Sequence, residues 1–258
     1  MHTRIFLTAL LTALFVATSE ADYIRVKRII NGTLAPSVPW AARLITSNSG
    51  YMIYSQCGGS LINAQWVLTA KHCLINPDGT DSGVKQIAVG NNNYARGKLR
   101  RVAAKYFVSH TKFQYLADDI ALIKLDRPVY GVTPVKIQLQ NNLDYGGMWA
   151  TIYGWGHTVE GAGHDDSSTV DLRATSVILV DRRYCEPNKI CFDPNLTRTN
   201  ACVGDSGGPM VYNYNNEQVL LGVTSTVSAQ PLCSGAILTG YMSVPYYANW
   251  IRSTIRNY

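Results

Sequence analysis

Charge is scarce in this chain. Asp, Glu, Lys and Arg make up 16% of the 258 residues, whereas 47% are hydrophobic. This composition excludes an intrinsically disordered protein, which needs high charge and few apolar residues. Basic residues outnumber acidic ones by 23 to 17, but the excess is spread thinly along the chain. A nucleic-acid-binding protein concentrates such charge on one face, so no nucleic-acid partner is expected.

The cysteines and the apolar runs narrow the class further. None of the six cysteines belongs to a C-x-x-C pair of the kind that zinc sites use. An even number of cysteines without such pairs predicts disulfides in an oxidising compartment. No stretch reaches the roughly 20 apolar residues that a bilayer-spanning helix requires. We therefore expect disulfides, no metal site and no membrane partner.

The N-terminus has the form of a secretory signal peptide. A basic start with Arg4 precedes an apolar run from Ile5 to Ala17, and small residues follow. Cleavage after Ser19 makes residues 1–19 the signal peptide, with cleavage after Ala21 as the alternative. The protein is therefore expected to be secreted and extracellular.

A short basic segment, residues 20–28, ends at Arg28 and is followed by the apolar residue Ile29. One interpretation is a charged N-terminal tail. The other is an activation propeptide cut after Arg28, which would leave Ile29 as a new N-terminus. The choice depends on whether a group further along the chain requires a free amine.

The remaining chain predicts an all-β protein. Short β-rich runs alternate with turns rich in Gly, Pro, Asn and Asp, the pattern of a sandwich or barrel. Four such runs are Trp66–Thr69, Ile120–Leu125, Trp149–Tyr153 and Val219–Thr224. One helix is predicted from Pro245 to about Arg256, because Tyr247, Ile251 and Ile255 form a single apolar stripe.

Three short motifs carry the functional signal. His72 ends the string Leu-Thr-Ala-Lys-His before a cysteine, Asp118-Asp119 precedes Ile-Ala-Leu, and Ser206 lies within Gly-Asp-Ser-Gly-Gly-Pro. Taken singly, they fit a half-buried histidine, a turn aspartate and a glycine-rich turn. Together, in the order His, Asp, Ser, they are specific.

With these motifs the chain resembles the chymotrypsin-like serine endopeptidases, the family of trypsin and elastase. The similarity extends over residues 29–258 and includes Cys57–Ile62, Gly154–Gly156 and the closing helix. The resemblance implies two packed six-stranded antiparallel β-barrels with a C-terminal α-helix. The boundary between the barrels is expected at about 130–145, with the active site in the cleft between them.

The resemblance implies a catalytic triad. Ser206 would be the nucleophile, and its weakly acidic hydroxyl needs an adjacent base. His72 has the pKa range for that task, and Asp119 would orient the imidazole. Asp118 is the alternative acid; Asp119 is preferred because it directly precedes Ile-Ala-Leu.

The same resemblance assigns roles around the triad. The N–H groups of Gly204 and Ser206 would form the oxyanion hole, and Ser225 would lie beside the triad aspartate. Asp205 would be partly buried and would require a cation, because an unpaired buried charge is costly. The amine of Ile29, freed by cleavage after Arg28, would supply it, so the resemblance predicts a zymogen.

The family pattern also assigns the cysteines and the substrate pocket. The implied disulfides are Cys57–Cys73, Cys185–Cys191 and Cys202–Cys233. Asn200 replaces the aspartate of trypsin-like pockets, and Val227 and Thr239 stand at wall positions that are glycine in open pockets. This pattern predicts elastase-like cleavage after small aliphatic residues at P1, the residue before the scissile bond. The alternative is that Val227 only packs, and that Leu or aromatic P1 residues fit.

The expected partners are protein or peptide substrates, an activating trypsin-like protease and protein inhibitors, with the enzyme a monomer. No cofactor is expected, and Asn91–Asn93 replace the acidic ligands of calcium-binding relatives. Two alternatives stay open. One is a catalytically silent binding protein on the same fold. The other is a polyanion-binding role for Arg96, Lys98, Arg100 and Arg101, whose simplest interpretation is a solvated loop.

Overall fold

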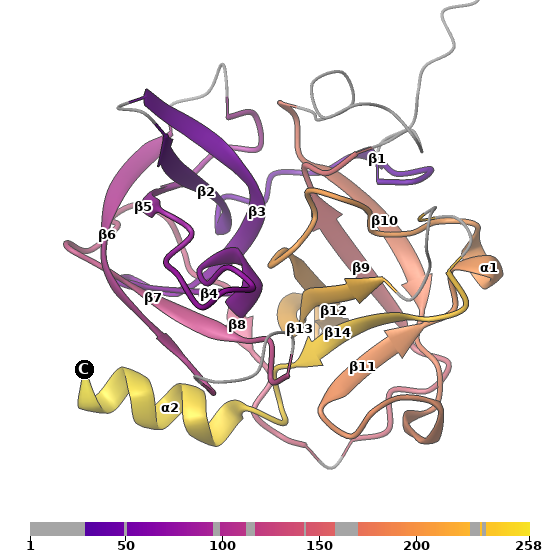
Figure 1. Cartoon of the computed structure of the whole chain (residues 1–258). Helices are drawn as coiled ribbons and strands as arrows, with labels where there is room; N and C mark the ends of the chain where they lie inside the picture. Colours follow the sequence, from indigo (N-terminus) through magenta and orange to yellow (C-terminus); the bar gives the residue numbers. More distant parts are fainter. Residues whose placement is uncertain are drawn as a thin grey trace, which may run out of the picture.

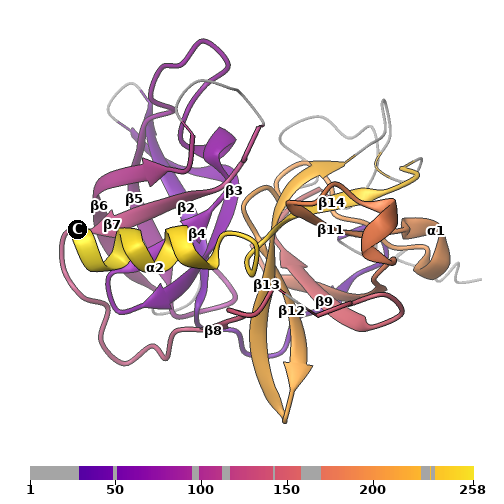
Figure 2. The same cartoon turned by 90° about the horizontal axis from the view of Figure 1, so that it is seen from below.

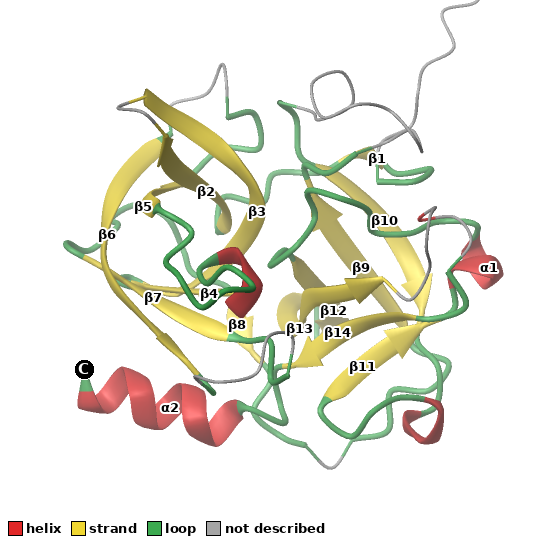
Figure 3. Ribbon diagram, in the orientation of Figure 1, coloured by secondary structure: helices red, strands yellow, loops and turns green. Residues whose placement is uncertain are grey.

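The computed structural model describes residues 29–48, 51–94, 99–111, 117–141, 143–157, 170–227, 233 and 236–258. The signal peptide and propeptide predicted for residues 1–28 lie outside these ranges. Figure 1 shows two β-structures side by side, and Figure 3 shows strands in both of them.

The first half is a closed barrel. Six strands pair in the order β2-β3-β4-β7-β6-β5, and every pairing is antiparallel. Their bounds are β2 Ala41–Asn48, β3 Tyr51–Asn63, β4 Trp66–Thr69, β5 Val84–Val89, β6 Arg100–Ser109 and β7 Ala121–Leu125. Leu44, Leu61, Leu68, Ile87 and Leu122 are fully buried and belong to one core. Burial of these side chains from several strands is what stabilises the closed sheet.

The second half is an eight-stranded sheet. Its strands are β1 Thr33–Leu34, β8 Lys136–Ile137, β9 Trp149–Gly154, β10 Arg173–Ile178, β11 Lys189–Phe192, β12 Pro209–Tyr214, β13 Glu217–Val227 and β14 Thr239–Ser243. Six of them follow the path β10-β9-β12-β13-β14-β11. A single bridge between Leu179 and Phe192 connects the two ends of that path. The six strands therefore curve round almost into a second barrel.

Each end of the described chain packs against the half of the molecule that lies further from it in the sequence. The N-terminal strand β1 pairs with β10 of the second sheet. The C-terminal helix α2, Ala248–Asn257, lies along the first barrel, where the Tyr106 hydroxyl donates to the Tyr258 carbonyl at 3.2 Å (Figure 2). Ile251 of α2 is buried in the same core as the barrel strands. Three short helices complete the fold: η1 Lys71–Cys73, η2 Arg182–Tyr184 and α1 Pro194–Thr197.

The all-β class, the six-stranded barrel and the C-terminal helix are confirmed, with differences in detail. The second half carries two extra strands, β1 and β8, and β8 pairs with β13 in parallel. The helix begins at Ala248 instead of Pro245, because Val244–Tyr247 form a turn in which the Tyr246 N–H donates to Ser243 Oγ. None of the helices in the described ranges combines the length and apolar character needed to cross a membrane.

Candidate active site

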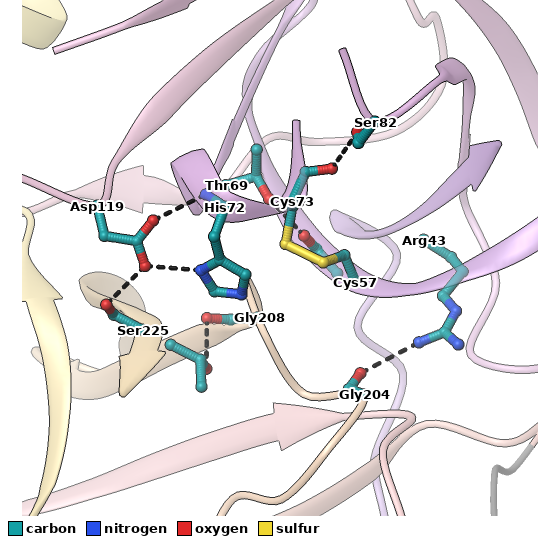
Figure 4. Close-up of a disulfide and its surroundings, with 12 residues drawn as sticks. Arg43, Cys57, Thr69, His72, Cys73, Ser82, Asp119, Gly204, Gly208 and Ser225 are labelled. Carbon is teal, nitrogen blue, oxygen red and sulfur yellow. Dashed lines mark hydrogen bonds and ion pairs between the residues drawn. A yellow bond between two sulfur atoms is a disulfide. The ribbon is translucent and has the colours of Figure 1, made fainter. Parts of the chain in front are cut away.

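His72 and Asp119 meet because β4 and β7 are neighbouring strands. The register pairs Thr69 with Ala121, so η1, which follows β4, lies beside the residues that lead into β7. His72 Nδ1 lies 2.7 Å from Asp119 Oδ2, and the His72 backbone N–H donates to Oδ1 at 2.9 Å (Figure 4). The carboxylate therefore fixes both the position and the plane of the imidazole.

Asp119 is fully buried and is held by a third donor. Ser225 Oγ donates to Asp119 Oδ2 at 2.7 Å. The β13–β14 register shifts between Thr224 and Thr226, so Ser225 is the extra residue of a bulge. Bulges redirect side chains out of the regular alternation, which explains how Ser225 turns toward the carboxylate. Burial alone would raise the pKa of Asp119, but the bonds from His72 and Ser225 outweigh it, and the pKa lies below its ordinary value.

Asp118, the alternative acid, is directed elsewhere. Its Oδ1 accepts from the Tyr247 hydroxyl at 2.5 Å and from Asn188 Nδ2 at 3.3 Å, and its Oδ2 lies 3.4 Å from His110 Nδ1. Its φ of 42° turns the backbone so that adjacent aspartates diverge. The geometry favours Asp119 as the partner of His72.

The turn that contains Ser206 packs against the end of β4. The Gly58 N–H donates to the Ser206 carbonyl at 2.7 Å, and the Gly207 N–H donates to the Thr224 carbonyl at 2.9 Å. A Cβ on Gly207 would lie 2.3 Å from Thr69 Oγ1, and its φ is 73°, so only glycine fits there. Ser206 is partly exposed, and among the described residues no hydrogen bond joins its hydroxyl to His72.

Two N–H groups of this turn are left available. Within the described chain, the backbone bonds of the turn use the N–H groups of Asp205, Gly207 and Gly208, and none uses those of Gly204 or Ser206. Gly204 has a φ of 95°, and a Cβ there would lie 2.8 Å from the Gly156 Cα. The turn thus presents two donors on either side of Asp205, in a conformation that a side chain at Gly204 would prevent.

Asp205 is buried beneath the turn. The Gly156 N–H donates to its Oδ1 at 2.8 Å and the Cys202 N–H to its Oδ2 at 2.9 Å. Burial raises the pKa of Asp205 to about 6, although these N–H groups and the charge of Arg43 act in the opposite direction. The Ile29 side chain is buried in the core of the second half, and the Ile30 N–H donates to the Asn200 carbonyl at 3.1 Å.

The structure contains the three disulfides that the resemblance implies. They are Cys57–Cys73, Cys185–Cys191 and Cys202–Cys233, and no free cysteine remains. Cys57, His72 and Cys73 lie within 4.8 Å of one another, a spacing that suits a metal ion. Both sulfurs are joined to each other, however, so neither is available as a thiolate ligand.

The residues assigned to the substrate pocket are only partly described. Asn200 is buried; its Nδ2 donates to the Cys233 carbonyl at 2.5 Å, and its Oδ1 accepts from Thr239 Oγ1 at 2.7 Å. The backbone of Val227 pairs with that of Thr239 across β13 and β14. The Val227 side chain lies outside the described residues.

Two buried basic side chains near the site were missed by sequence reasoning. Lys71 Nζ donates to the Ala117 carbonyl at 2.6 Å, and burial lowers its pKa. Arg43 in β2 is 3% exposed and donates through Nη1 to the Gly204 carbonyl at 3.3 Å. The only sequence signal for Arg43 is a charged residue within the apolar run from Trp40 to Ile45.

The basic run considered for polyanions is also only partly described. Arg96 and Lys98 lie outside the described residues, whereas Arg100 and Arg101 begin β6 and are exposed. These two arginines and Arg127 line the same surface hollow of about 470 Å³.

A histidine fixed by a buried carboxylate, next to a serine turn with two available N–H donors, defines the class of serine hydrolases. Comparison with known proteins agrees. The family model named Trypsin matches residues 29–251. The collagenase of Hypoderma lineatum is 31% identical over 260 residues, which cover 93% of this chain and 92% of the relative. Serine protease 1 of Drosophila melanogaster is 32% identical over 235 residues, which cover 87% of this chain and 84% of the relative.

Comparison with solved structures indicates the same family. HL collagenase matches with a TM-score of 0.71 and 28% identity, over 88% of this chain and 98% of that chain. The chain therefore belongs to the trypsin family of chymotrypsin-like serine proteases. As a protease, it acts on protein substrates.

Proposed function

We propose that this protease is a secreted zymogen that cleaves peptide bonds through an acyl-enzyme, with Ser206 as nucleophile, His72 as base and Asp119 as the group that orients the base. The observation that carries the proposal is the 2.7 Å contact between His72 Nδ1 and the buried Asp119 carboxylate. The Ser206 turn packs close to this pair, since a Cβ on Gly207 would lie 3.1 Å from the Ala70 backbone N, two residues before His72. A catalytically silent binding protein has no need of this arrangement.

The proposed reaction follows from the groups present. A proton on His72 Nδ1 points to Asp119, which leaves Nε2 free to accept the Ser206 proton as Oγ attacks the substrate carbonyl. The N–H groups of Gly204 and Ser206 stabilise the negative charge that develops on the carbonyl oxygen. His72 then gives its proton to the leaving amine, which departs. A water molecule that gives a proton to His72 then attacks the acyl-enzyme, and this releases the acid product and restores Ser206.

Activation is proposed to require cleavage after Arg28. In this scheme residues 1–19 are the signal peptide, residues 20–28 the propeptide and residues 29–258 the peptidase domain. Support comes from Asp205, a buried carboxylate whose pKa is raised by desolvation. A new ammonium at Ile29 would stabilise its charge, and the Ile29 side chain is already buried in the second half.

We further propose a preference for small aliphatic P1 residues, with Ala or Val favoured. Asn200 carries no charge, so it offers nothing to pair with Arg or Lys. Thr239 is fully buried and bonded to Asn200, which limits the depth available between them. Leu and aromatic P1 residues are the competing outcome. An enzyme with this preference would cut poorly after Arg28, so its activator would be a separate trypsin-like protease.

Secretion is supported by the three disulfides, because such bonds persist in oxidising compartments. We propose that the active enzyme is an extracellular monomer that protein inhibitors can block at the substrate cleft.

Kinetics of the activated protein test this function. The full chain, purified as the proform, is treated with a trypsin-like protease, which is then inactivated with a protein inhibitor specific for Arg and Lys pockets. Hydrolysis of peptides with Ala or Val at P1 is expected for the wild type. Ser206→Ala should abolish it, and Ser253→Ala, a serine on α2 away from the site, should not. Equal activity of S206A and wild type would refute the proposal.

A second candidate function rests on the hollow lined by Arg100, Arg101 and Arg127. One guanidinium group can bind two oxygens of a phosphate or sulfate group at once, so this hollow suits a polyanion. Binding there is compatible with protease activity. Retention on a heparin column at physiological salt, reduced when the three arginines are changed to Gln, would support it. Elution of wild type and variant together would exclude it.

A further inference from the structure

Arg43 is a charged residue in the middle of an apolar strand. Its neighbours in β2, Ala42 and Leu44, are fully buried, and Arg43 itself is 3% exposed. Removing a guanidinium from water is strongly unfavourable unless specific contacts compensate for it. A buried arginine on this strand therefore needs a structural reason.

Arg43 contacts the turn of residues 204–208, which contains Ser206. Its Nη1 donates to the Gly204 carbonyl at 3.3 Å, and Figure 4 shows the side chain extending toward Gly204. The guanidinium carbon lies 5.6 Å from the ring centre of Tyr94 and 5.9 Å from that of Trp155. Tyr94 belongs to the first half and Trp155 directly follows β9 of the second. The two rings hold the cation between the halves, where it faces the turn.

The charge of Arg43 also acts on Asp205. Arg43 favours the ionised form of the Asp205 carboxylate, against the effect of burial. In the uncleaved chain the Ile29 nitrogen is an amide and carries no charge. Arg43 thus supplies positive charge to this turn before any cleavage after Arg28.

We propose that Arg43 is a positioning residue that holds the Gly204–Asp205 peptide by its carbonyl and so fixes the direction of the Gly204 N–H in the oxyanion hole. This inference rests on the proposed function. The carbonyl of Gly204 and its N–H lie on two successive peptide units, joined at a Cα with a φ of 95°. Holding the Gly204–Asp205 unit in place fixes the Cα to which the other unit is attached, and this restricts how the unit that carries the Gly204 N–H can turn.

Transition-state binding separates this role from a merely structural one. A peptide boronate with Val at P1 forms a tetrahedral adduct with Ser206 and uses the oxyanion hole, whereas the matching peptide amide does not. The activated enzyme is compared with Arg43→Met, Arg43→Lys and Lys124→Met. Lys124 is the matched control, a second cation stacked on a ring, 4.8 Å from the Trp66 centre.

The expected result is a fall in kcat of about 10- to 100-fold for R43M with little change in KM, less than full loss of an oxyanion donor would cause. Boronate affinity should fall by the same factor, amide affinity should stay constant, and K124M should match wild type. Arg43→Lys keeps the charge but lacks the planar fork, so it should be intermediate. If R43M does not fold, the same comparison is made with R43K.

Two results would overturn the inference: boronate binding by R43K as tight as by wild type, or an equal loss of boronate and amide affinity. An inactive wild type would instead refute the proposed function itself. The outcomes are therefore distinguishable.

Discussion

Replacement of Asp119 by Asn isolates the role of its charge. The carboxylate accepts three hydrogen bonds, from the His72 N–H at 2.9 Å, from Ser225 Oγ at 2.7 Å and across 2.7 Å to His72 Nδ1. An amide group can replace it in two orientations. With its NH₂ toward the His72 backbone, two donors would face each other. The opposite orientation is therefore favoured, and the NH₂ then donates to Nδ1.

This orientation moves the imidazole proton to Nε2, the atom that accepts the Ser206 proton in the proposed reaction. We expect D119N to fold normally and to lose about 10⁴ in kcat, the scale seen when this tautomer is reversed in serine proteases. That loss corresponds to about 5 kcal/mol of activation free energy. The assay is single-turnover and steady-state hydrolysis of a Val P1 peptide by the activated enzyme at pH 8.

The neighbouring Asp118 provides the control. Its carboxylate contacts Tyr247, Asn188 and His110, and not His72. D118N should keep kcat within a few-fold of wild type. A D119N enzyme with more than a tenth of the wild-type kcat, or equal losses in the two variants, would refute this reasoning.

Three other predictions follow from the same geometry. The pKa of Asp205 is about 6 in the folded protein and 3.8 in the unfolded chain. The free energy of unfolding of a Ser206→Ala proform should therefore fall by about 3 kcal/mol in total as the pH rises from about 4 to 6. Asp205→Asn should therefore remove this pH dependence of the unfolding free energy, measured by urea melts, and the same pH dependence in the variant would contradict the prediction. Changing Cys57 and Cys73 together to Ala should cost about 3 kcal/mol of unfolding free energy in urea melts, and no loss would exclude a stabilising disulfide. Thr239→Gly should shift preference from Val toward Leu or Phe in a P1-varied peptide screen, which an unaltered profile would rule out.

Local sequence predicted the parts of the site that depend on short motifs. His72, Asp119 and Ser206 each stand in a short string that is ambiguous alone, and only the three strings together, in that order, indicated the site. Apolar patterning predicted β4 and β7. Asp119 was preferred over Asp118 by resemblance only. Their separation depends on a positive φ at Asp118, which the sequence does not reveal.

Features that depend on long-range contacts were beyond the sequence. The bulge at Ser225 exists because β13 pairs irregularly with β14, and the parallel pairing of β8 requires the final position of β13. Arg43 reads as an anomaly in an apolar strand until Gly204, 161 residues away, is brought against it. Burial and partners are set by the tertiary fold, and residue type alone does not contain them.

Covalent labelling of the activated protein with an organophosphate, followed by peptide mapping, tests the proposed nucleophile directly. The proposed mechanism predicts one adduct, on Ser206, which forms with wild type, is absent from S206A and forms much more slowly in His72→Ala. An adduct on another serine, or labelling at Ser206 that proceeds as fast without His72, would contradict the claim that a histidine-activated hydroxyl performs the chemistry.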